Sequence, residues 1–299
     1  MTVRILQFGT SGQLARELLG QAKDFDVEIT ALSRADADFA DPQAVVRRLG
    51  QGEYDLVVLA AAYTAVDLAE SERDLAFTVN AETPGAIAKA LNADGPALVQ
   101  VSTDYVFAGD KGAPYVESDA TAPLNVYGAS KLEGERRILA ASPRALILRT
   151  SWVVSSHGKN FVKTMLRAAG ESRALKVVDD QFGRPTAARD LARFILSQAG
   201  RLAAAKAGDP VFGVHHFANA GEVTWKGFAD GIFAAALGDK APAVACGSAA
   251  DWPAPAKRPV RGTLDTSQLE RTFGVTLRPW REPVAEIVAE LQSEARSAA

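Results

Sequence analysis

Near its N-terminus the chain reads Val3-Arg-Ile-Leu-Gln-Phe-Gly-Thr-Ser-Gly-Gln-Leu-Ala15, a short apolar run that leads into a glycine turn and then into residues with helical spacing. In such a strand–turn–helix unit, Gly9 allows the tight turn, and Gly12 lets the backbone approach a pyrophosphate at the helix N-terminus. Ala15 takes the small position where the helix packs on the sheet. A purely architectural turn is the alternative, but the place directly after an apolar strand favours dinucleotide binding. The residues expected to contact the cofactor here are Gly9, Ser11, Gly12, Gln13 and Leu14.

The first half of the chain repeats this alternation of short apolar runs and longer amphipathic segments. The runs are continuous in hydrophobicity rather than alternating, which is typical of strands buried on both faces of a parallel sheet. Strand and helix in regular succession predict an α/β fold with a Rossmann-like doubly wound parallel sheet. The expected strands are Val3–Phe8, Val27–Leu32, Leu56–Ala61, Leu98–Val101 and Ala145–Leu148, and the expected helices are Gln13–Leu19, Pro42–Leu49, Ala76–Leu91 and Lys131–Ala140.

After about residue 150 the pattern loosens, which indicates a smaller lobe in the second half. We expect an NAD(P)-binding Rossmann domain over residues 1–152. Residues 153–299 are expected to form mainly a substrate-binding lobe, with some segments returning to the Rossmann domain. The expected elements are helices at Phe161–Ala169, Asp190–Gln198, Trp225–Ala236 and Pro283–Glu294, a strand at Gly213–Phe217 and a surface loop at Pro242–Pro259.

Charge and composition argue against several kinds of partner. The 299 residues carry 33 basic and 36 acidic side chains without a basic run, so nothing indicates binding to nucleic acid or to a membrane surface. Cys246 is the only cysteine, so neither an intrachain disulfide nor a cysteine-based metal cluster can form. The apolar start Val3–Phe8 is too short for the apolar region of a signal peptide, and no stretch reaches the roughly 18 residues of a spanning helix. We expect a cytoplasmic protein.

The end of the second expected strand bears on the choice of cofactor. NAD-specific sites usually place an acid there to bind the ribose hydroxyls, whereas an arginine suits the 2′-phosphate of NADP. Arg34 stands at this place, after Leu32-Ser33. The expected cofactor is therefore NADPH, with NADH possible, because an exposed loop arginine is the alternative interpretation.

Tyr127 and Lys131 stand four residues apart, which places both side chains on one face of a helix. A phenol has an unperturbed pKa near 10, and a neighbouring ammonium is expected to lower the pKa of Tyr127 toward the range of acid–base catalysis. The lysine can also hold the nicotinamide ribose. Thr103 ends an expected buried strand, at the edge where open α/β sheets bind ligands, so its hydroxyl can hold a carbonyl that Tyr127 protonates. Strand-end capping is the alternative for Ser102 and Thr103.

The glycine turn, Thr103 and the Tyr127–Lys131 pair together resemble the extended short-chain dehydrogenase/reductases. A further set of segments is similar to one branch of them, the dTDP-4-dehydrorhamnose reductases, and spans nearly the whole chain. These segments are Ala60–Glu72, Val79-Asn80, Ser102–Phe107, Pro123–Gly128, Arg149–Val153, Asn160–Leu166, Asp180–Thr186, Thr224-Trp225, Arg258-Pro259 and Leu264–Thr266.

The resemblance implies a role for each matched residue. Tyr127 would donate the proton, Lys131 would bind the cofactor, and Thr103 would position the C4 carbonyl of the substrate. Asp104 and Trp152 match positions that contact the sugar nucleotide, with turn capping and core packing as the alternatives. The implied reaction reduces dTDP-4-dehydro-β-L-rhamnose to dTDP-β-L-rhamnose. The further positions matched to the cofactor site are Asp38, Phe39, Ala60, Ala61, Ala62 and Tyr63.

The sequence departs from this family pattern at two places. Tyr63 stands where relatives often have histidine. Some members form a dimer bridged by Mg²⁺ through glutamates, and Glu17 and Glu290 match two of these, but Arg189 stands at the third. A cation beside a cationic side chain is disfavoured, so we expect no metal and a monomer or a homodimer held otherwise.

The remaining interpretations concern the histidines and the substrate. His157, His215 and His216 are expected to be buried or hydrogen-bonded rather than metal ligands, because neighbours on a strand point to opposite faces. Substrate loops decide between this reaction and that of a reductase or epimerase acting on another nucleotide-linked keto-sugar. A non-catalytic nucleotide-binding regulatory subunit is a further alternative.

Overall fold

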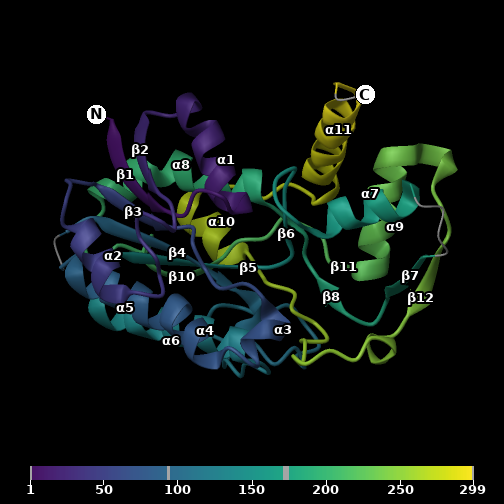
Figure 1. The fold of residues 1–299 in the computed structure, drawn as a ribbon, viewed down its shortest axis with the longest axis horizontal. Helices are drawn as coiled ribbons and strands as arrows, with labels where there is room; N and C mark the ends of the chain where they lie inside the picture. The colour runs from purple at the N-terminus through teal and green to yellow at the C-terminus, as the bar shows by residue number, and fades with distance from the viewer. Residues whose placement is uncertain (1, 93–94, 171–174, 298–299) are drawn as a thin grey trace.

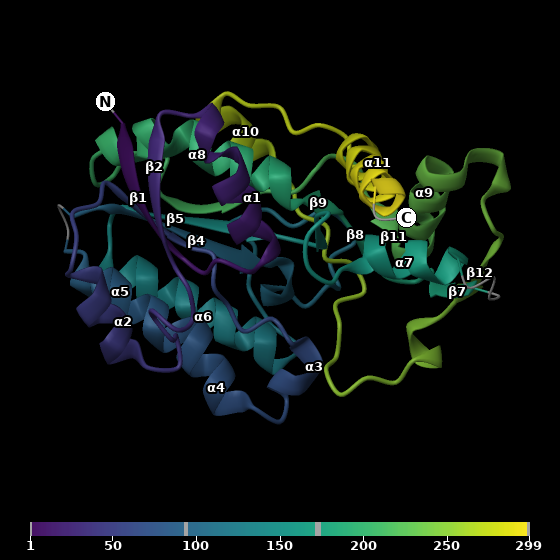
Figure 2. The same ribbon diagram turned by 45° about the horizontal axis from the view of Figure 1, so that its top comes forward.

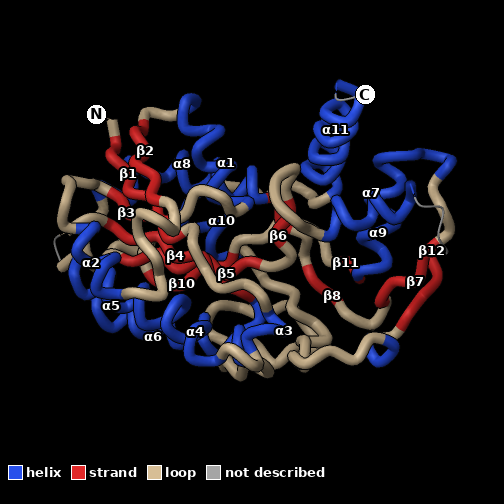
Figure 3. Tube along the Cα trace, in the orientation of Figure 1, coloured by secondary structure: helices blue, strands red, loops and turns tan. Residues whose placement is uncertain are grey.

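The computed structural model describes residues 2–92, 95–170 and 175–297. Within these residues its centre is a six-stranded sheet whose neighbouring strands all run parallel (Figure 1; Figure 3). The α/β class and the parallel sheet expected from the sequence are confirmed. The strand order is β2 (Val27–Leu32), β1 (Val3–Phe8), β3 (Leu56–Leu59), β4 (Ala97–Thr103), β5 (Ala145–Thr150) and β10 (Gly213–His216).

Helices cover both faces of the sheet, because its strands bury side chains on both sides (Figure 2). One face is covered by α1 (Gln13–Gln21), α8 (Ala188–Ala204) and α10 (Ser267–Phe273), and the other by α2 (Pro42–Leu49), α5 (Thr83–Ala90) and α6 (Val126–Ala141). We call this sheet with its helices the sheet lobe. Since α8, β10 and α10 come after residue 150, the second half of the chain completes it.

The strand order reverses between β1 and β3, which opens a crevice at the carboxyl edge of the sheet. Ligands of open α/β sheets bind at such a point. Gly9 follows β1 and lies against the loop after β3: its φ is +103°, and a Cβ there would lie 3.1 Å from the carbonyl carbon of Ala60. Glycine alone takes this conformation without strain.

Elements from the second half of the chain form an outer lobe beside this edge of the sheet (Figure 1). Its core joins Phe228 and Ile232 of one helix to Val284 and Ile287 of another. A short pair, β6 (Val153–Val154) and β9 (Thr186–Ala187), lies at the junction of the two lobes. The outer-lobe elements are α7 (Phe161–Gly170), α9 (Trp225–Leu237) and α11 (Arg281–Ser297), the parallel pair β7 (Leu175–Val178) and β12 (Val244–Gly247), and the antiparallel pair β8 (Phe182–Gly183) and β11 (Val223–Thr224).

Two sequence expectations are wrong. The segment Pro242–Pro259, expected as a loop, contains β12, whose ladder partner β7 is far away in the sequence. The expected single helix Ala76–Leu91 is interrupted, because α4 (Arg73–Phe77) passes through a π-helical segment, Thr78–Glu82, before α5 begins. The short helix α3 (Val66–Ala69) was not predicted. No helix among the described residues is long and apolar enough to cross a membrane.

Candidate active site

Most of the predicted site residues line one cavity of about 590 Å³ at the carboxyl edge of the sheet, next to the outer lobe. Its walls come from the turn after β1, the end of β4, the first turns of α6 and the start of α9. Motifs that are far apart in the sequence therefore meet in one place. The predicted residues that line the cavity are Ser11, Gly12, Gln13, Leu14, Ala60, Ala62, Thr103, Asp104, Tyr127, Lys131 and Trp152.

The N-terminus of α1 faces this cavity. Gly12 is its N-cap, no side chain of the described residues caps its first N–H groups, and its first turn has no acidic residue. A Cβ at Gly12 would have only the Ala60 carbonyl oxygen nearby, at 3.7 Å, so the backbone is accessible. Uncapped N–H groups at a helix N-terminus bind anions. The turn therefore fits the pyrophosphate of a dinucleotide.

The local structure at the start of α6 places Tyr127. The helix begins at Val126, directly before Tyr127, and Asn125 is its N-cap. The Asn125 side chain accepts a hydrogen bond from the Gly128 N–H (2.8 Å). Gly128 has to be small, because a Cβ there would lie 2.2 Å from the Tyr105 carbonyl oxygen. The Tyr105 ring packs edge-to-face on Tyr127, with centroids 5.7 Å apart. Lys131 follows one helical turn later and lines the same cavity.

Burial changes the acid–base properties of both catalytic candidates. It raises the pKa of Tyr127 to about 12, an effect that a hydrogen bond with the Thr103 hydroxyl opposes. The expectation that Lys131 lowers this pKa is wrong, because the Lys131 ammonium donates instead to the Val101 carbonyl oxygen (2.6 Å). Burial also lowers the pKa of Lys131 to about 8. Tyr127 is thus a neutral phenol that stays protonated near neutral pH.

Thr103 and Asp104 stand side by side where β4 ends. Thr103 Oγ1 donates to the Asp104 carboxylate (3.1 Å) and accepts from the Tyr105 N–H (3.1 Å). The Asp104 side chain is buried, and burial raises the pKa of its carboxyl to about 7. Gly262 closes over it, since a Cβ there would lie 2.3 Å from Asp104 Oδ2. A hydroxyl and a titratable carboxyl therefore share the cavity wall with the phenol.

A buried ion pair anchors the catalytic helix to the sheet. Glu135, one turn after Lys131 on α6, binds Arg149 of β5 (2.7 Å), and their side chains are 2% and 5% exposed. The Ser102 hydroxyl of β4 also donates to Glu135. Because α6 is tied to two neighbouring strands in this way, Tyr127 and Lys131 keep their place relative to the end of β4.

Aromatic rings form the wall on the side of the outer lobe. Trp152 stacks on Trp225 with centroids 3.6 Å apart, and Trp225 contacts Phe161 at 4.7 Å. Trp152 has a φ of +45°, which is unfavourable for a bulky residue. Gly183 makes room for its ring, because a Cβ there would lie 2.5 Å from Trp152 Cε2. Strained conformations of this kind cluster at ligand sites, held by the surrounding packing.

Some predicted cofactor residues do not line the cavity. Arg34 lies exposed beyond β2, where it pairs with Asp38 (3.2 Å). Phe39 is buried against Phe8, with ring centroids 5.4 Å apart. Tyr63 donates its hydroxyl proton to a carboxylate oxygen of Glu72 (2.7 Å). The full set outside the lining is Gly9, Arg34, Asp38, Phe39, Ala61 and Tyr63.

The residues considered for a metal have protein partners. Glu290 pairs with Arg189 (2.5 Å), and Glu17 accepts a hydrogen bond from a serine hydroxyl of the loop after β6 (3.0 Å). His215 and His216 are buried, and burial lowers the pKa of His216 to about 3. Among the described residues no three histidine, cysteine or acidic side chains are grouped so that they could hold a metal ion.

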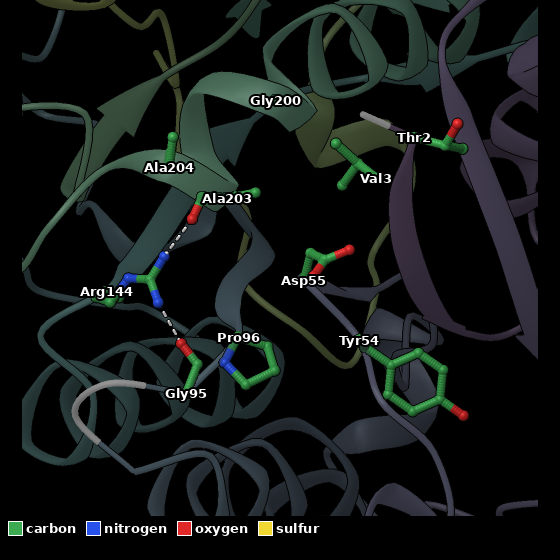
Figure 4. Close-up of a pocket in the computed structure, with 10 residues that line it drawn as sticks. All are labelled: Thr2, Val3, Tyr54, Asp55, Gly95, Pro96, Arg144, Gly200, Ala203 and Ala204. Carbon is green, nitrogen blue, oxygen red and sulfur yellow. Dashed lines mark hydrogen bonds between the residues drawn. The ribbon is translucent and has the colours of Figure 1, made fainter.

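A second cavity, of about 450 Å³, lies at the opposite edge of the sheet (Figure 4). Asp55, Pro96 and Arg144 line it, next to the amino ends of strands β3, β4 and β5. Arg144 donates to the carbonyl oxygens of Gly95 and Ala203, so its charge is directed at backbone. Ligands of open α/β sheets bind at the carboxyl ends instead, which favours the first cavity as the active site.

Several residues of the first cavity were not predicted. Thr150 and Ser151 follow the same strand-end logic as Thr103, since Thr150 lies directly opposite Thr103 in the β4–β5 register. That logic could have found them. Lys159 and Trp225 come from the outer lobe, and no residue spacing in the sequence points to their place in the wall.

Fold and cavity together define the class of protein. A doubly wound parallel sheet, a glycine turn at its switch point and a threonine–tyrosine–lysine set at the same edge characterise an extended short-chain dehydrogenase/reductase. The family model described as RmlD substrate binding domain matches residues 3–293. The chain belongs to this family.

Individual relatives match over the full length of the chain. The dTDP-4-dehydrorhamnose reductase of Sinorhizobium fredii is 42% identical over 298 residues, which cover 99% of this chain and 100% of the relative. The crystal structure of a dTDP-4-dehydrorhamnose reductase from Clostridium acetobutylicum superposes with a TM-score of 0.89 at 37% identity, covering 97% and 99% of the two chains. That of the Bacillus anthracis enzyme in complex with NADP gives 0.88 at 33% identity, covering 97% and 100%. The similarity thus includes the outer lobe as well as the sheet lobe.

Proposed function

We propose that the protein catalyses the NADPH-dependent reduction of the C4 keto group of dTDP-4-dehydro-β-L-rhamnose to dTDP-β-L-rhamnose, with NADH as a possible second cofactor. The observation that carries this proposal is that Thr103, Tyr127 and Lys131 line one cavity with the uncapped N-terminus of α1. The names of its full-length relatives support the choice of substrate.

Tyr127 supplies the proton of this reaction. As hydride adds to C4, the π electrons of the carbonyl move to its oxygen, which takes the phenolic proton. The raised pKa of Tyr127, about 12, keeps the phenol protonated at neutral pH, as a donor must be. The Thr103 hydroxyl holds the carbonyl oxygen toward the phenol. General acid catalysis of this kind contributes about 10²- to 10⁴-fold in rate.

The nicotinamide cofactor supplies the hydride when it is bound. The residues from Ser11 to Leu14 would hold its pyrophosphate at the N-terminus of α1, and Lys131 would hold the nicotinamide ribose. Arg34 would face the 2′-phosphate that distinguishes NADPH from NADH. The complex of the Bacillus anthracis relative with NADP supports this choice. The further residues proposed around the cofactor are Gly9, Asp38, Phe39, Ala60, Ala61, Ala62 and Tyr63.

Asp104 and Trp152 both line the cavity and would contact the sugar nucleotide. Asp104 would contact it from the end of β4, and Trp152 from the aromatic wall. We propose residues 1–152 as the cofactor-binding domain and residues 153–299 as mainly the substrate-binding lobe, with some segments returning to the cofactor-binding domain. A cytoplasmic monomer or homodimer acting on dTDP-sugars is the corresponding assembly.

Two alternatives differ from this proposal in outcome. A reductase or epimerase that acts on another nucleotide-linked keto-sugar would use the same catalytic residues. A regulatory subunit that only binds nucleotide would not need them, and the presence of Thr103, Tyr127 and Lys131 in one cavity favours catalysis.

The deciding experiment follows the absorbance of NADPH with enzymatically generated dTDP-4-dehydrorhamnose, for the wild type and for Tyr127→Phe. The wild type is expected to consume NADPH and yield dTDP-rhamnose. The variant keeps the ring but loses the proton, so kcat should fall about 10²- to 10⁴-fold while NADPH still binds. A wild type that binds NADPH and turns nothing over would refute the substrate or the catalytic role.

A further inference from the structure

One side chain of the glycine turn reaches the substrate side of the cavity. Gln13, the first residue of α1, donates from Nε2 to the Val153 carbonyl oxygen (3.2 Å) and accepts at Oε1 from Asn160 Nδ2 (2.9 Å). Gln13 lies at the helix N-terminus that fits the pyrophosphate, whereas Asn160 directly precedes α7 of the outer lobe. These hydrogen bonds therefore join the proposed cofactor site to the outer lobe.

Asn160 organises the loop on its side of this contact. Its Nδ2 also donates to the carbonyl oxygens of Ser155 (2.7 Å) and His157 (3.2 Å). Its Oδ1 accepts from the Lys163 N–H (3.2 Å), which caps the first turn of α7. The same loop contributes Gly158 to the cavity wall. The orientation of the Asn160 amide thus determines both this loop and the start of α7.

The start of α7 connects Asn160 to the aromatic wall. Phe161, next to Asn160, contacts Trp225 at a centroid distance of 4.7 Å, and Trp225 stacks on Trp152 at 3.6 Å. Both tryptophans line the cavity. A continuous series of contacts leads from the N-terminus of α1 to the wall that faces the sugar nucleotide.

We propose that Asn160 is a positioning residue that couples dinucleotide binding at α1 to sugar-nucleotide binding at the aromatic wall, through Gln13. This inference rests on the proposed function. A pyrophosphate held by the first N–H groups of α1 fixes the backbone of Gln13, and its side chain then holds Asn160. The aromatic wall is ordered before the sugar nucleotide arrives. By reciprocity, the sugar nucleotide strengthens dinucleotide binding by the same factor.

The size of the effect follows from the contact that transmits it. One hydrogen bond between neutral groups changes an equilibrium constant roughly two- to tenfold. We therefore expect NADP⁺ to raise the affinity for dTDP about five- to tenfold, which lies at the lower end of measured coupling between sites.

The test measures the affinity of the full chain for dTDP by calorimetry, without and with saturating NADP⁺, in the wild type and in three variants. Asn160→Ser keeps a hydroxyl that can cap α7 but is too short to reach Gln13. Gln13→Met keeps the length of the side chain and removes both of its hydrogen bonds. Ser155→Ala is the matched control, because Ser155 Oγ donates to Glu17 of α1 (3.0 Å) without lining the cavity.

Wild type and Ser155→Ala are expected to bind dTDP about five- to tenfold more tightly with NADP⁺. In Asn160→Ser and Gln13→Met this ratio should fall to near one, and the double variant should be no further reduced. Asn160→Ser should also raise KM for the sugar nucleotide more than it lowers kcat.

Two results would overturn the coupling. One is a ratio near one in the wild type, and the other is an unchanged ratio in Asn160→Ser. If both nucleotides bind independently of each other, the coupling fails while the proposed function stands. If neither nucleotide binds, the proposed function fails together with the coupling.

Discussion

The sheet lobe and the outer lobe build their parts of the cavity by different means. In the sheet lobe, Thr103 and Lys131 are placed by a strand register and a helix anchored beneath by a buried ion pair. In the outer lobe the strands have only two to four residues, and Trp152 and Trp225 are placed by ring stacking. Backbone ladders hold positions by repeated directional bonds, whereas stacking holds them by shape.

This difference means that the catalytic residues and the residues proposed to bind the sugar nucleotide are held in place by different parts of the fold. A substitution in the ion pair that anchors α6 should lower the rate of proton transfer. A substitution in the aromatic wall should weaken sugar-nucleotide binding. The contact between Gln13 and Asn160 is where the two supports meet. Substitutions on either side of this contact can therefore show whether the lobes act separately.

The largest effect should follow from breaking the support of the sheet lobe. Glu135→Ala leaves the Arg149 guanidinium buried without its carboxylate, so the free energy of unfolding should fall by about 3–5 kcal/mol. Because α6 carries the catalytic pair, kcat should fall as well, while the affinity of the folded protein for dTDP changes less. Urea unfolding and steady-state kinetics measure these quantities.

The matched control for this change lies on the same helix. Glu133→Ala removes the exposed pair with Arg137 on α6 and should cost only about 0.3–0.5 kcal/mol. A similar loss in both variants would mean that the buried pair does not hold the catalytic helix.

A smaller, pH-dependent effect on stability should follow from substituting Asp104, which lines the cavity next to the outer lobe. Burial raises the pKa of Asp104 from 3.8 to about 7, so the folded state holds this proton more tightly than the unfolded state. The contribution of Asp104 to the stability of the folded state is therefore highest at low pH and is lost as the pH rises from about 4 to about 7. Asp104→Asn removes this fall and should be more stable than wild type above that range by roughly 2–4 kcal/mol.

Thermal unfolding across this pH range measures the difference between Asp104→Asn and wild type. Asp119→Asn serves as the opposite control, because the pKa of Asp119 is lowered by its hydrogen bond to Lys111. Because Asp119 is ionised in both the folded and the unfolded state from about pH 4 to about 7, that variant should be less stable than wild type by a constant amount across this range. If Asp104→Asn runs parallel to wild type at every pH, the carboxyl does not titrate in this range.

The smallest effect should follow from weakening the wall of the outer lobe. Trp225→Leu removes the stacking on Trp152, which is worth about 0.5–1.5 kcal/mol beyond the buried area. KM for the sugar nucleotide should rise up to about tenfold, with the dissociation constant of NADPH unchanged in binding measurements. An equal loss of NADPH affinity would contradict the separation of the two lobes.

Much of the sheet lobe could be predicted from the sequence. The five expected strands of the first half all form. Strands β3, β4 and β5 are buried almost throughout and leave continuous apolar runs, whereas β2, at the edge of the sheet, alternates half-buried and exposed residues. The glycine turn, Thr103 and the Tyr127–Lys131 pair could be located since each depends on spacing within one strand or one helix. Strand β12 could not be predicted, because only its distant partner β7 makes the segment Val244–Gly247 a strand.

The sequence alone determined the class of fold and the identity of the catalytic candidates, since both follow from residue type and local period. The tertiary structure decided their environment. Burial raises the pKa of Tyr127, and Lys131 donates to a backbone carbonyl rather than to the phenol. It also decided that Gln13 meets Asn160 and that Trp152 stacks on Trp225. Those contacts depend on how distant segments pack, and no local spacing records that packing.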